Sequence, residues 1–211
     1  MRVHLNSAFV RLKQNMPMDD KAIEWLYLNN KTDTARYILG EKSQKMLACI
    51  GINPSTAKPA ELDNTLESVQ RIARFNGFDG WVMYNIYPLR ATDPKELPAG
   101  MNIDHHLKNN EVVRRSVIDL EIDSIWAAWG NLIDTRDYLL PCLVDLYRNL
   151  SDLHLNWRII EDTTQKGHPR HPLYKKAANE LLAFDMDRYM REFSAPTTAQ
   201  TPIHAMRGTH R

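Results

Sequence analysis

Met46-Leu-Ala-Cys-Ile-Gly-Ile-Asn-Pro-Ser-Thr-Ala57 is the stretch that decides the fold, and Glu61-Leu-Asp-Asn-Thr-Leu66 continues it. Its apolar part, residues 46–52, has the length and composition of a strand that is buried on both faces. Pro54 ends this run because it has no N–H for a sheet ladder, and it biases Asn53 toward an extended conformation. A helical pattern follows over residues 61–76. We therefore predict that a buried strand leads through a short polar loop into a helix.

This junction is the place where open α/β sheets bind their ligands. Free backbone N–H groups at the start of the helix favour an anion, and Ser55, Thr56 and Asn64 add short polar side chains. The alternative interpretation is a helix N-terminal region that carries ordinary turn residues.

The composition is that of a globular protein without a strong overall charge. Of its 211 residues, 43% are hydrophobic and 25% are charged, which is enough apolar material for a core. The net charge of +1 provides no global field that would attract nucleic acid. Cys49 and Cys142 lie in apolar runs, which favours reduced, buried thiols over a disulfide.

Several classes of protein are not expected from the sequence. No apolar run reaches the roughly 20 residues that a membrane span needs, and the N-terminus has no apolar signal-peptide core. The cysteines do not have the spacing of metal ligands. We expect a cytoplasmic protein with no membrane contact, no bound metal and no cofactor.

Apolar runs alternate with helical patterns along the chain. A short amphipathic helix is predicted over residues 22–28. Strands are predicted over residues 36–40, 46–52, 81–87, 124–130 and 153–160. Helices are predicted over residues 61–76, 103–121, 134–150 (interrupted near Pro141) and 173–193. This alternation predicts an α/β fold of three layers, with a mainly parallel sheet of four or five strands between helices and the 46–52 strand at its centre.

The expected organisation is a single domain with two terminal segments. Residues 1–35 are predicted to be a helical N-terminal extension, and residues 36–193 a single α/β domain. Residues 194–211 offer little apolar surface and are predicted to be a flexible tail.

Polar clusters directly follow the predicted strands. Parallel strands end at one edge of their sheet, so we expect these clusters to line a single cleft. Asp63 is a candidate general base or metal ligand, or an ordinary acidic residue in the first turn of a helix. Arg90 suits a phosphate or carboxylate, or else forms a salt bridge with Asp93 or a surface carboxylate. Trp129 stacks on a base or sugar, or belongs to the core. The expected ligand-binding residues are Pro54, Ser55, Thr56, Asn64, Asn85, Tyr87, Arg90, Thr92, Trp129, Gly130 and Arg170.

The densest cluster is Lys166-Gly-His-Pro-Arg-His-Pro-Leu-Tyr174. Its histidines, arginine and prolines are typical of a rigid loop that presents cationic or proton-transferring groups. His168 and His171 are possible metal ligands, but the carboxylates close in sequence are only Glu161 and Asp162. We therefore expect no metal at this loop.

Several separated motifs together resemble one protein family, the domain-of-unknown-function family DUF1643, over roughly residues 36–174. The motifs are Arg36-Tyr, Ile52-Asn-Pro-Ser-Thr-Ala57, Asp63-Asn-Thr65, Asn85-Ile-Tyr-Pro-Leu-Arg-Ala-Thr-Asp-Pro94, Ala128-Trp-Gly130 and Gly167-His-Pro-Arg-His-Pro-Leu-Tyr174. The family usually has Asp-Asp-Pro-Thr where this chain has Leu62-Asp-Asn-Thr65. A single acidic residue is retained there, which argues against chemistry that needs two carboxylates.

Gly51-Ile-Asn-Pro54 is also similar to the first motif of the mismatch-type uracil-DNA glycosylases, and a His-Pro motif after a late strand occurs in that superfamily. This resemblance implies a uracil-DNA glycosylase-like α/β/α fold in which Asn53 positions a water. It also implies that His168 or His171 stabilises a departing anionic base.

We therefore expect a hydrolase or transferase that acts on a nucleobase, nucleotide or nucleic acid, with N-glycosidic hydrolysis as the candidate reaction. The expected catalytic residues are Asn53, Asp63, His168 and His171. The alternative is a non-catalytic module that binds a nucleotide, a nucleic acid or a protein partner in the same cleft.

Overall fold

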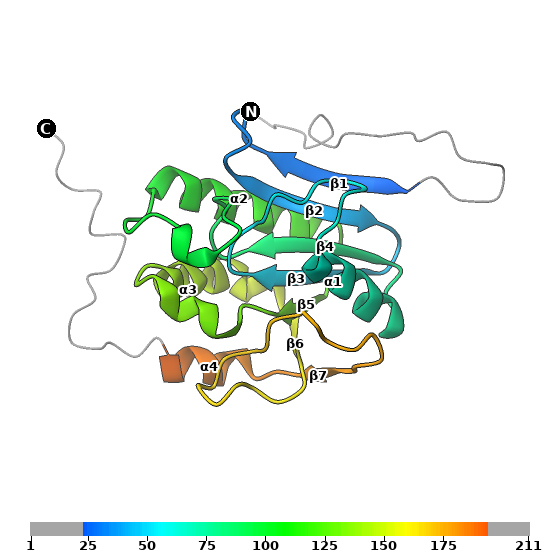
Figure 1. Cartoon of the computed structure of the whole chain (residues 1–211). Coiled ribbons are helices and arrows are strands. Elements are labelled where there is room, and N and C mark those ends of the chain that lie inside the picture. The colour runs from blue at the N-terminus through cyan, green and yellow to red at the C-terminus, as the bar shows by residue number, and fades with distance from the viewer. Residues whose placement is uncertain (1–22, 194–211) are drawn as a thin grey trace, which may run out of the picture.

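The computed structural model describes residues 23–193, whose strands form one seven-stranded sheet in the order β1-β2-β4-β3-β5-β6-β7 (Figure 1). The strands are β1 (Glu24–Asn29), β2 (Arg36–Lys42), β3 (Met46–Gly51), β4 (Gly80–Asn85), β5 (Ser124–Ala127), β6 (Asn156–Ile160) and β7 (Leu181–Ala183). The predicted central strand is confirmed, because β3 lies in the middle of the sheet. It pairs with β4 on one side and with β5 on the other.

The sheet is mixed, and the prediction of a mainly parallel sheet of four or five strands was wrong. Strands β4, β3, β5 and β6 are parallel neighbours. Antiparallel pairs extend this group at both ends. Strand β2 pairs with β4 and β1 pairs with β2 at one end, and β7 pairs with β6 at the other. The sequence pattern did not predict β1 and β7, and these two strands form the edges of the sheet.

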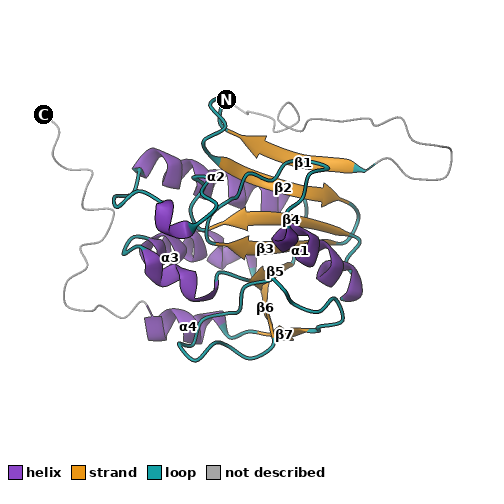
Figure 2. Cartoon of the chain, viewed as in Figure 1, coloured by secondary structure: helices purple, strands orange, loops and turns teal. Residues whose placement is uncertain are grey.

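Helices cover both faces of the sheet, so the protein is an α/β protein (Figure 2). The helices are α1 (Asn64–Phe75), α2 (Ile103–Asp119), α3 (Leu139–Leu150) and α4 (Met186–Phe193), and short 3₁₀ helices occur at Pro94–Glu96, Gly130–Thr135 and Ser151–Leu153. Helix α1 packs on one face, and α2, α3 and α4 pack on the other.

The central strand contributes to both cores because successive side chains of a strand point to opposite faces. Leu47 and Cys49 pack with α1, whereas Ala48 and Ile50 pack with α2 and α3. All four side chains are fully buried. Cys49 and Cys142 are both free and buried, as the sequence predicted.

The structure corrects the predicted helices at three places. Residues 24–29 form strand β1 rather than a helix, and Trp25 and Leu26 are buried by pairing with β2. The helix predicted from residue 134 begins at Leu139, and Pro141 lies in its first turn, where an N–H has no intrahelical acceptor.

The helix predicted over 173–193 is instead a loop, strand β7 and the short helix α4. The charged composition of this segment favoured a helix, but pairing of Leu181 with Ile160 draws it into the sheet. The predictions for residues 1–22 and for the tail 194–211 lie outside the described residues.

Candidate functional site

The loops that follow β3 and β4 lie against each other at the edge where these parallel strands end. The Asn53 side-chain amide donates to the Ala91 carbonyl at 2.8 Å, and the Ala91 N–H donates to the Pro54 carbonyl at 3.0 Å. Arg90 donates to the carbonyls of Ser55 and Ala57. The structure therefore joins two of the polar clusters that the sequence assigned to one cleft.

Arg90 fixes these loops to the antiparallel part of the sheet. Its Nη2 donates to the Tyr27 hydroxyl at 2.8 Å and to Asp33 at 2.9 Å. The salt-bridge alternative is thus realised with Asp33, a residue that the sequence analysis did not select. Its Nη1 donates to the loop carbonyls, whereas its Nε is buried without a partner among the described residues. Arg90 therefore holds the two loops to β1 and to the loop that follows it.

Asp63 is the N-cap of α1. One carboxylate oxygen accepts from the Leu66 N–H at 2.9 Å, and the other accepts from the Ser55 hydroxyl at 2.6 Å. This is the structural role that a short acidic residue commonly has at a helix start. Asp63 therefore holds the loop after β3 to the beginning of α1.

Asn85, the last residue of β4, is 1% exposed, and neither its amide nitrogen nor its carbonyl oxygen has a hydrogen-bond partner among the described residues. It pairs with Gly51, and a Cβ atom placed on that glycine would lie 3.3 Å from the Asn85 carbonyl oxygen. Buried polar groups are nearly always hydrogen-bonded. An unpaired donor and acceptor next to each other, at the end of a central parallel strand, therefore require an explanation.

Asn109 of α2 provides a contrast with Asn85. It is fully buried, and its side-chain oxygen has no partner among the described residues, but its side-chain nitrogen donates to the Asn85 backbone carbonyl at 2.8 Å. This bond holds α2 against the end of β4. Sequence reasoning did not select Asn109, because a single asparagine in an amphipathic helix gives no signal for this contact.

His168 belongs to a buried network rather than to an open cleft. Trp129 Nε1 donates to the Tyr189 hydroxyl at 3.0 Å, and that hydroxyl lies 2.8 Å from His168 Nδ1. His168 Nε2 lies 3.2 Å from an Asp134 oxygen. A neutral ring protonated at Nε2 satisfies every contact, because Nδ1 then accepts from Tyr189 and Nε2 donates to Asp134. Burial lowers the His168 pKa and Asp134 opposes that effect, so the neutral form is favoured.

The network also explains Trp129, which is fully buried and lies in the core. Its ring packs against Tyr189 and Trp157, which come from α4 and β6. Both nitrogens of His168 and the indole nitrogen of Trp129 are engaged with other side chains. These two residues therefore support the surrounding loops.

His171, in contrast, lies at the sheet edge. Gly130 has a φ of +61° and approaches it so closely that an added Cβ would lie 3.3 Å from that of His171. Burial lowers the His171 pKa, and the charge of nearby Asp63 opposes this shift. His171 Nδ1 accepts from the Leu173 N–H, while Nε2 has no partner among residues 23–193. The loop of residues 167–172, called the His-Pro loop below, therefore lies beside the C-terminal end of β5 and the N-terminal end of α1.

The remaining predicted site residues have different surroundings. Tyr87 is buried, and its hydroxyl accepts from the Asn102 N–H at the start of α2. Arg170 turns toward its own loop and donates to the Asp162 carbonyl at 2.8 Å. Pro54 is buried, whereas Thr56, Asn64 and Thr92 are exposed.

Arg36 is the functional candidate that sequence reasoning missed. It opens β2, is 2% exposed, and donates from Nη1 to the Ala57 carbonyl at 3.0 Å. Its Nε is buried without a partner, and no described carboxylate lies within 4.0 Å. Burial, and secondly the charge of Arg90, lower its pKa to about 10. The sequence feature that could have identified Arg36 is a charged residue at the first position of an otherwise apolar strand.

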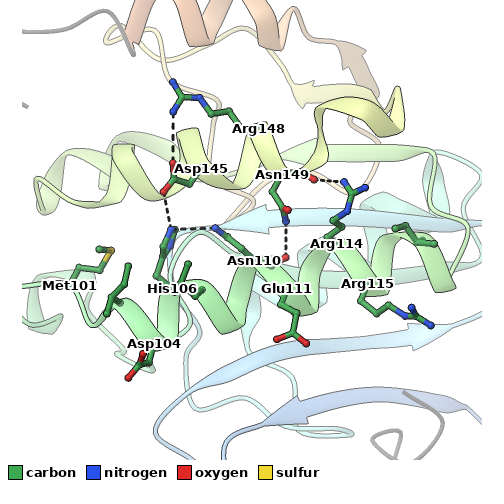
Figure 3. Close-up of a pocket in the computed structure, with 13 residues that line it drawn as sticks. Met101, Asp104, His106, Asn110, Glu111, Arg114, Arg115, Asp145, Arg148 and Asn149 are labelled. Atoms are coloured by element: carbon green, nitrogen blue, oxygen red, sulfur yellow. Dashed lines mark hydrogen bonds and ion pairs between the residues drawn. The ribbon is translucent and has the colours of Figure 1, made fainter. Parts of the chain in front are cut away.

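A separate groove of about 1250 Å³ lies on the outer side of α2 and α3. Figure 3 shows His106 between Asp145 and Asn110. Its Nε2 lies 3.2 Å from an Asp145 carboxylate oxygen and 3.3 Å from the Asn110 side-chain nitrogen. Exposed Leu107 and Ile118 contribute apolar surface. None of the sequence-predicted site residues lines this groove, so its volume does not bear on the loops at the sheet edge.

Between residues 23 and 193, no three or more His, Cys, Asp or Glu side chains are grouped so that they could hold a metal ion. Over the same residues, no helix has the length and apolar character required to cross a membrane.

Comparison with known proteins identifies the family. A family model described as "Protein of unknown function (DUF1643)" matches residues 36–173, which is more than half of the chain. The comparisons with curated proteins and with solved structures gave no match. The matched region begins at Arg36 and includes both loops at the sheet edge and the His-Pro loop. The chain therefore belongs to the DUF1643 family.

Proposed function

We propose that this protein binds a nucleobase-bearing ligand, a nucleotide or a segment of nucleic acid, at the edge where β3, β4 and β5 end. The observation that carries the proposal is the buried Asn85 side chain, whose amide and carbonyl have no partner among the described residues. An asparagine amide presents donors beside an acceptor, which is the complement of the polar edge of a base. Its buried position excludes water as a competitor for those bonds.

The surroundings of Asn85 are closely packed and fixed. A Cβ atom on Gly51 would lie 3.3 Å from the Asn85 side-chain oxygen and 2.5 Å from the terminal methyl carbon of Met83, so Met83 packs directly against this glycine. The neighbouring loop is held by Arg90 and Asp63, so it requires little reorganisation when a ligand binds. Because the net charge is only +1, local contacts rather than a long-range field would provide the affinity.

A second candidate function is hydrolysis of the N-glycosidic bond in such a ligand, as the glycosylase resemblance implies. Asn53 donates its amide to the Ala91 carbonyl, while its own carbonyl oxygen accepts from no described residue. That oxygen is available to orient a water, and His171 Nε2 is available to stabilise a departing base. In this proposal Asp63 and His168 hold the site together instead of reacting.

The proposal is tested by a thermal-shift panel of free bases, nucleosides, nucleotides and short oligonucleotides, including abasic DNA. A ligand that binds the folded state stabilises it by mass action, by about 2.7 kcal/mol at a hundredfold excess over its Kd. We expect Asn85→Ala to abolish the shift. The matched variant Asn110→Ala, in the α2–α3 groove, should retain it.

Two results would count against the proposal. If no member of the panel stabilises the wild-type protein, the ligand class is wrong. If a shift disappears in Asn110→Ala and persists in Asn85→Ala, the ligand binds the groove instead. Hydrolysis is tested separately by chromatography of released base, and Asn53→Ala should lower its rate because the attacking water loses the oxygen that orients it.

A further inference from the structure

Arg36 carries a buried positive charge for which the described residues provide no adjacent counter-charge. It is 2% exposed, its Nε is buried without a partner, and its Nη1 donates to a neutral carbonyl, that of Ala57. The ion pairs of the described residues include Arg90 with Asp33 but none with Arg36. A buried charge is normally paired or hydrogen-bonded throughout. This guanidinium satisfies neither condition.

The guanidinium of Arg90 adds a second positive charge close to that of Arg36. Arg90 Nη1 lies 3.4 Å from the same Ala57 carbonyl, so two cations meet at one backbone oxygen. Asp33 pairs with Arg90 but is half-exposed, and Asp63 is already bonded to Ser55 and Leu66. The charges of these two carboxylates favour the ionised form of Arg36 only as secondary effects after burial.

Several N–H donors at the loop after β3 have no acceptor among the described residues. The side-chain nitrogen Arg36 Nη2 donates to no described residue and, unlike Nε, is not sealed from solvent. The backbone N–H groups of Ser55 and Thr56 also have no acceptor within residues 23–193. Ser55 is joined to the start of the twelve-residue helix α1, because its hydroxyl donates to the N-cap residue Asp63 at 2.6 Å. A guanidinium and free amides are the donor set that phosphate oxygens accept.

We propose that Arg36, together with the loop of residues 53–57, binds a phosphate group of the ligand. This inference rests on the proposed function and makes it more specific. The loop begins after Gly51, which pairs with Asn85 in the sheet, and it ends at Ala57, whose carbonyl accepts from Arg36. The base of the ligand would lie at the first end of this loop and its phosphate at the second. The ligand is therefore a nucleotide or a nucleic-acid strand rather than a free base or a nucleoside.

The experiment uses inorganic phosphate as its first probe. Phosphate is titrated against the full-length protein and compared with chloride at equal ionic strength, with the melting temperature as the readout. We expect phosphate to stabilise the wild-type protein, Arg36→Met to lose the response and Arg71→Met to keep it. Arg71 is the matched control because it is an exposed arginine of α1 that pairs with Glu67, so its loss changes the net charge equally.

The second probe is a pair of ligands, namely the nucleoside that binds best in the panel and its 5′-monophosphate. The wild-type protein should bind the monophosphate about 10- to 100-fold more tightly, which is the usual contribution of a hydrogen bond to a charged group. Arg36→Met should reduce this ratio to near one while leaving nucleoside affinity unchanged.

Several outcomes would overturn the proposal. One is a rise in melting temperature with phosphate that is equal in the wild-type protein and in Arg36→Met. Another is an equal wild-type affinity for nucleoside and monophosphate, which would refute the phosphate subsite while leaving base binding intact. An Arg36-dependent phosphate response without any nucleoside or nucleotide binding would support the subsite and refute the proposed function. If Arg36→Met does not fold, the wild-type affinity ratio decides the question.

Discussion

Replacing Asn85 with alanine is expected to make the unliganded protein more stable. Asn85 is 1% exposed, and both of its polar side-chain atoms are sealed from water without a partner among the described residues. A side-chain amide that is buried in this way costs about 1–3 kcal/mol in the folded state. Removing the amide relieves this cost but leaves a small cavity, which costs about 0.7 kcal/mol if its volume is about 30 Å³. The net expectation is a gain of about 0.5–2 kcal/mol.

The matched control is Asn109→Ala, which removes an equally buried asparagine whose side-chain nitrogen is hydrogen-bonded, although its side-chain oxygen also has no partner among the described residues. Its amide donates to the Asn85 backbone carbonyl at 2.8 Å, so its removal leaves that buried carbonyl without this donor. We expect Asn109→Ala to lower the free energy of unfolding by about 1–3 kcal/mol. The two variants should therefore change stability in opposite directions.

Urea unfolding of the wild-type protein and both variants measures these free energies, with equal m-values showing that the transitions are comparable. The reasoning would be refuted if Asn85→Ala lost as much stability as Asn109→Ala. That result would mean that the Asn85 side chain forms stabilising bonds in the unliganded protein. Its amide would then not be reserved for a ligand.

Further variants test the support of the site. Tyr189→Phe removes the hydroxyl that joins Trp129 to His168, and unfolding should become easier by about 1–3 kcal/mol because two buried nitrogens lose their partner; an unchanged stability would contradict the network. Asp63→Ala should cost about 0.5–2 kcal/mol and Asp63→Asn much less, since the second keeps the helix cap; equal losses in urea unfolding would argue for a charge effect instead. Burial lowers the pKa of His106 and His168, so stability should be full above the unfolded pKa of about 6.5 and should fall below it by up to about 1.4 kcal/mol per pH unit for each histidine; a stability that stays flat on acidification through this range would refute neutral, buried rings.

The sequence predicted the parallel centre of the fold because its signals there are local and strong. The 46–52 run is apolar throughout, which is typical of a strand buried on both faces, and Pro54 marks its end. Strand β1 was misread because Trp25 and Leu26 are buried by pairing with β2, which is a non-local interaction. Strand β7 was missed for the same reason, since three residues carry no periodicity of their own.

For the site, the sequence predicted which loops meet but not what each side chain does there. The clusters after β3 and β4 do lie together, as parallel strand ends require. Whether a polar residue is engaged or free depends on partners far away in the chain. His168 is bonded to Tyr189 and Asp134, whereas Arg36 lacks a carboxylate partner among the described residues. No local pattern distinguishes these two situations.

The central claim is that Asn85 contacts the base of a nucleotide at the sheet edge, and the side-chain amide resonance of Asn85 tests it most directly. The ¹⁵N-labelled protein is titrated with nucleoside monophosphates, and Asn85→Ala assigns the resonance by its disappearance. We predict that at least one nucleotide shifts the Asn85 signal saturably and leaves the Asn110 and Asn149 side chains of the α2–α3 groove unchanged. Saturable shifts at Asn110 and Asn149 with no change at Asn85 would contradict the claim.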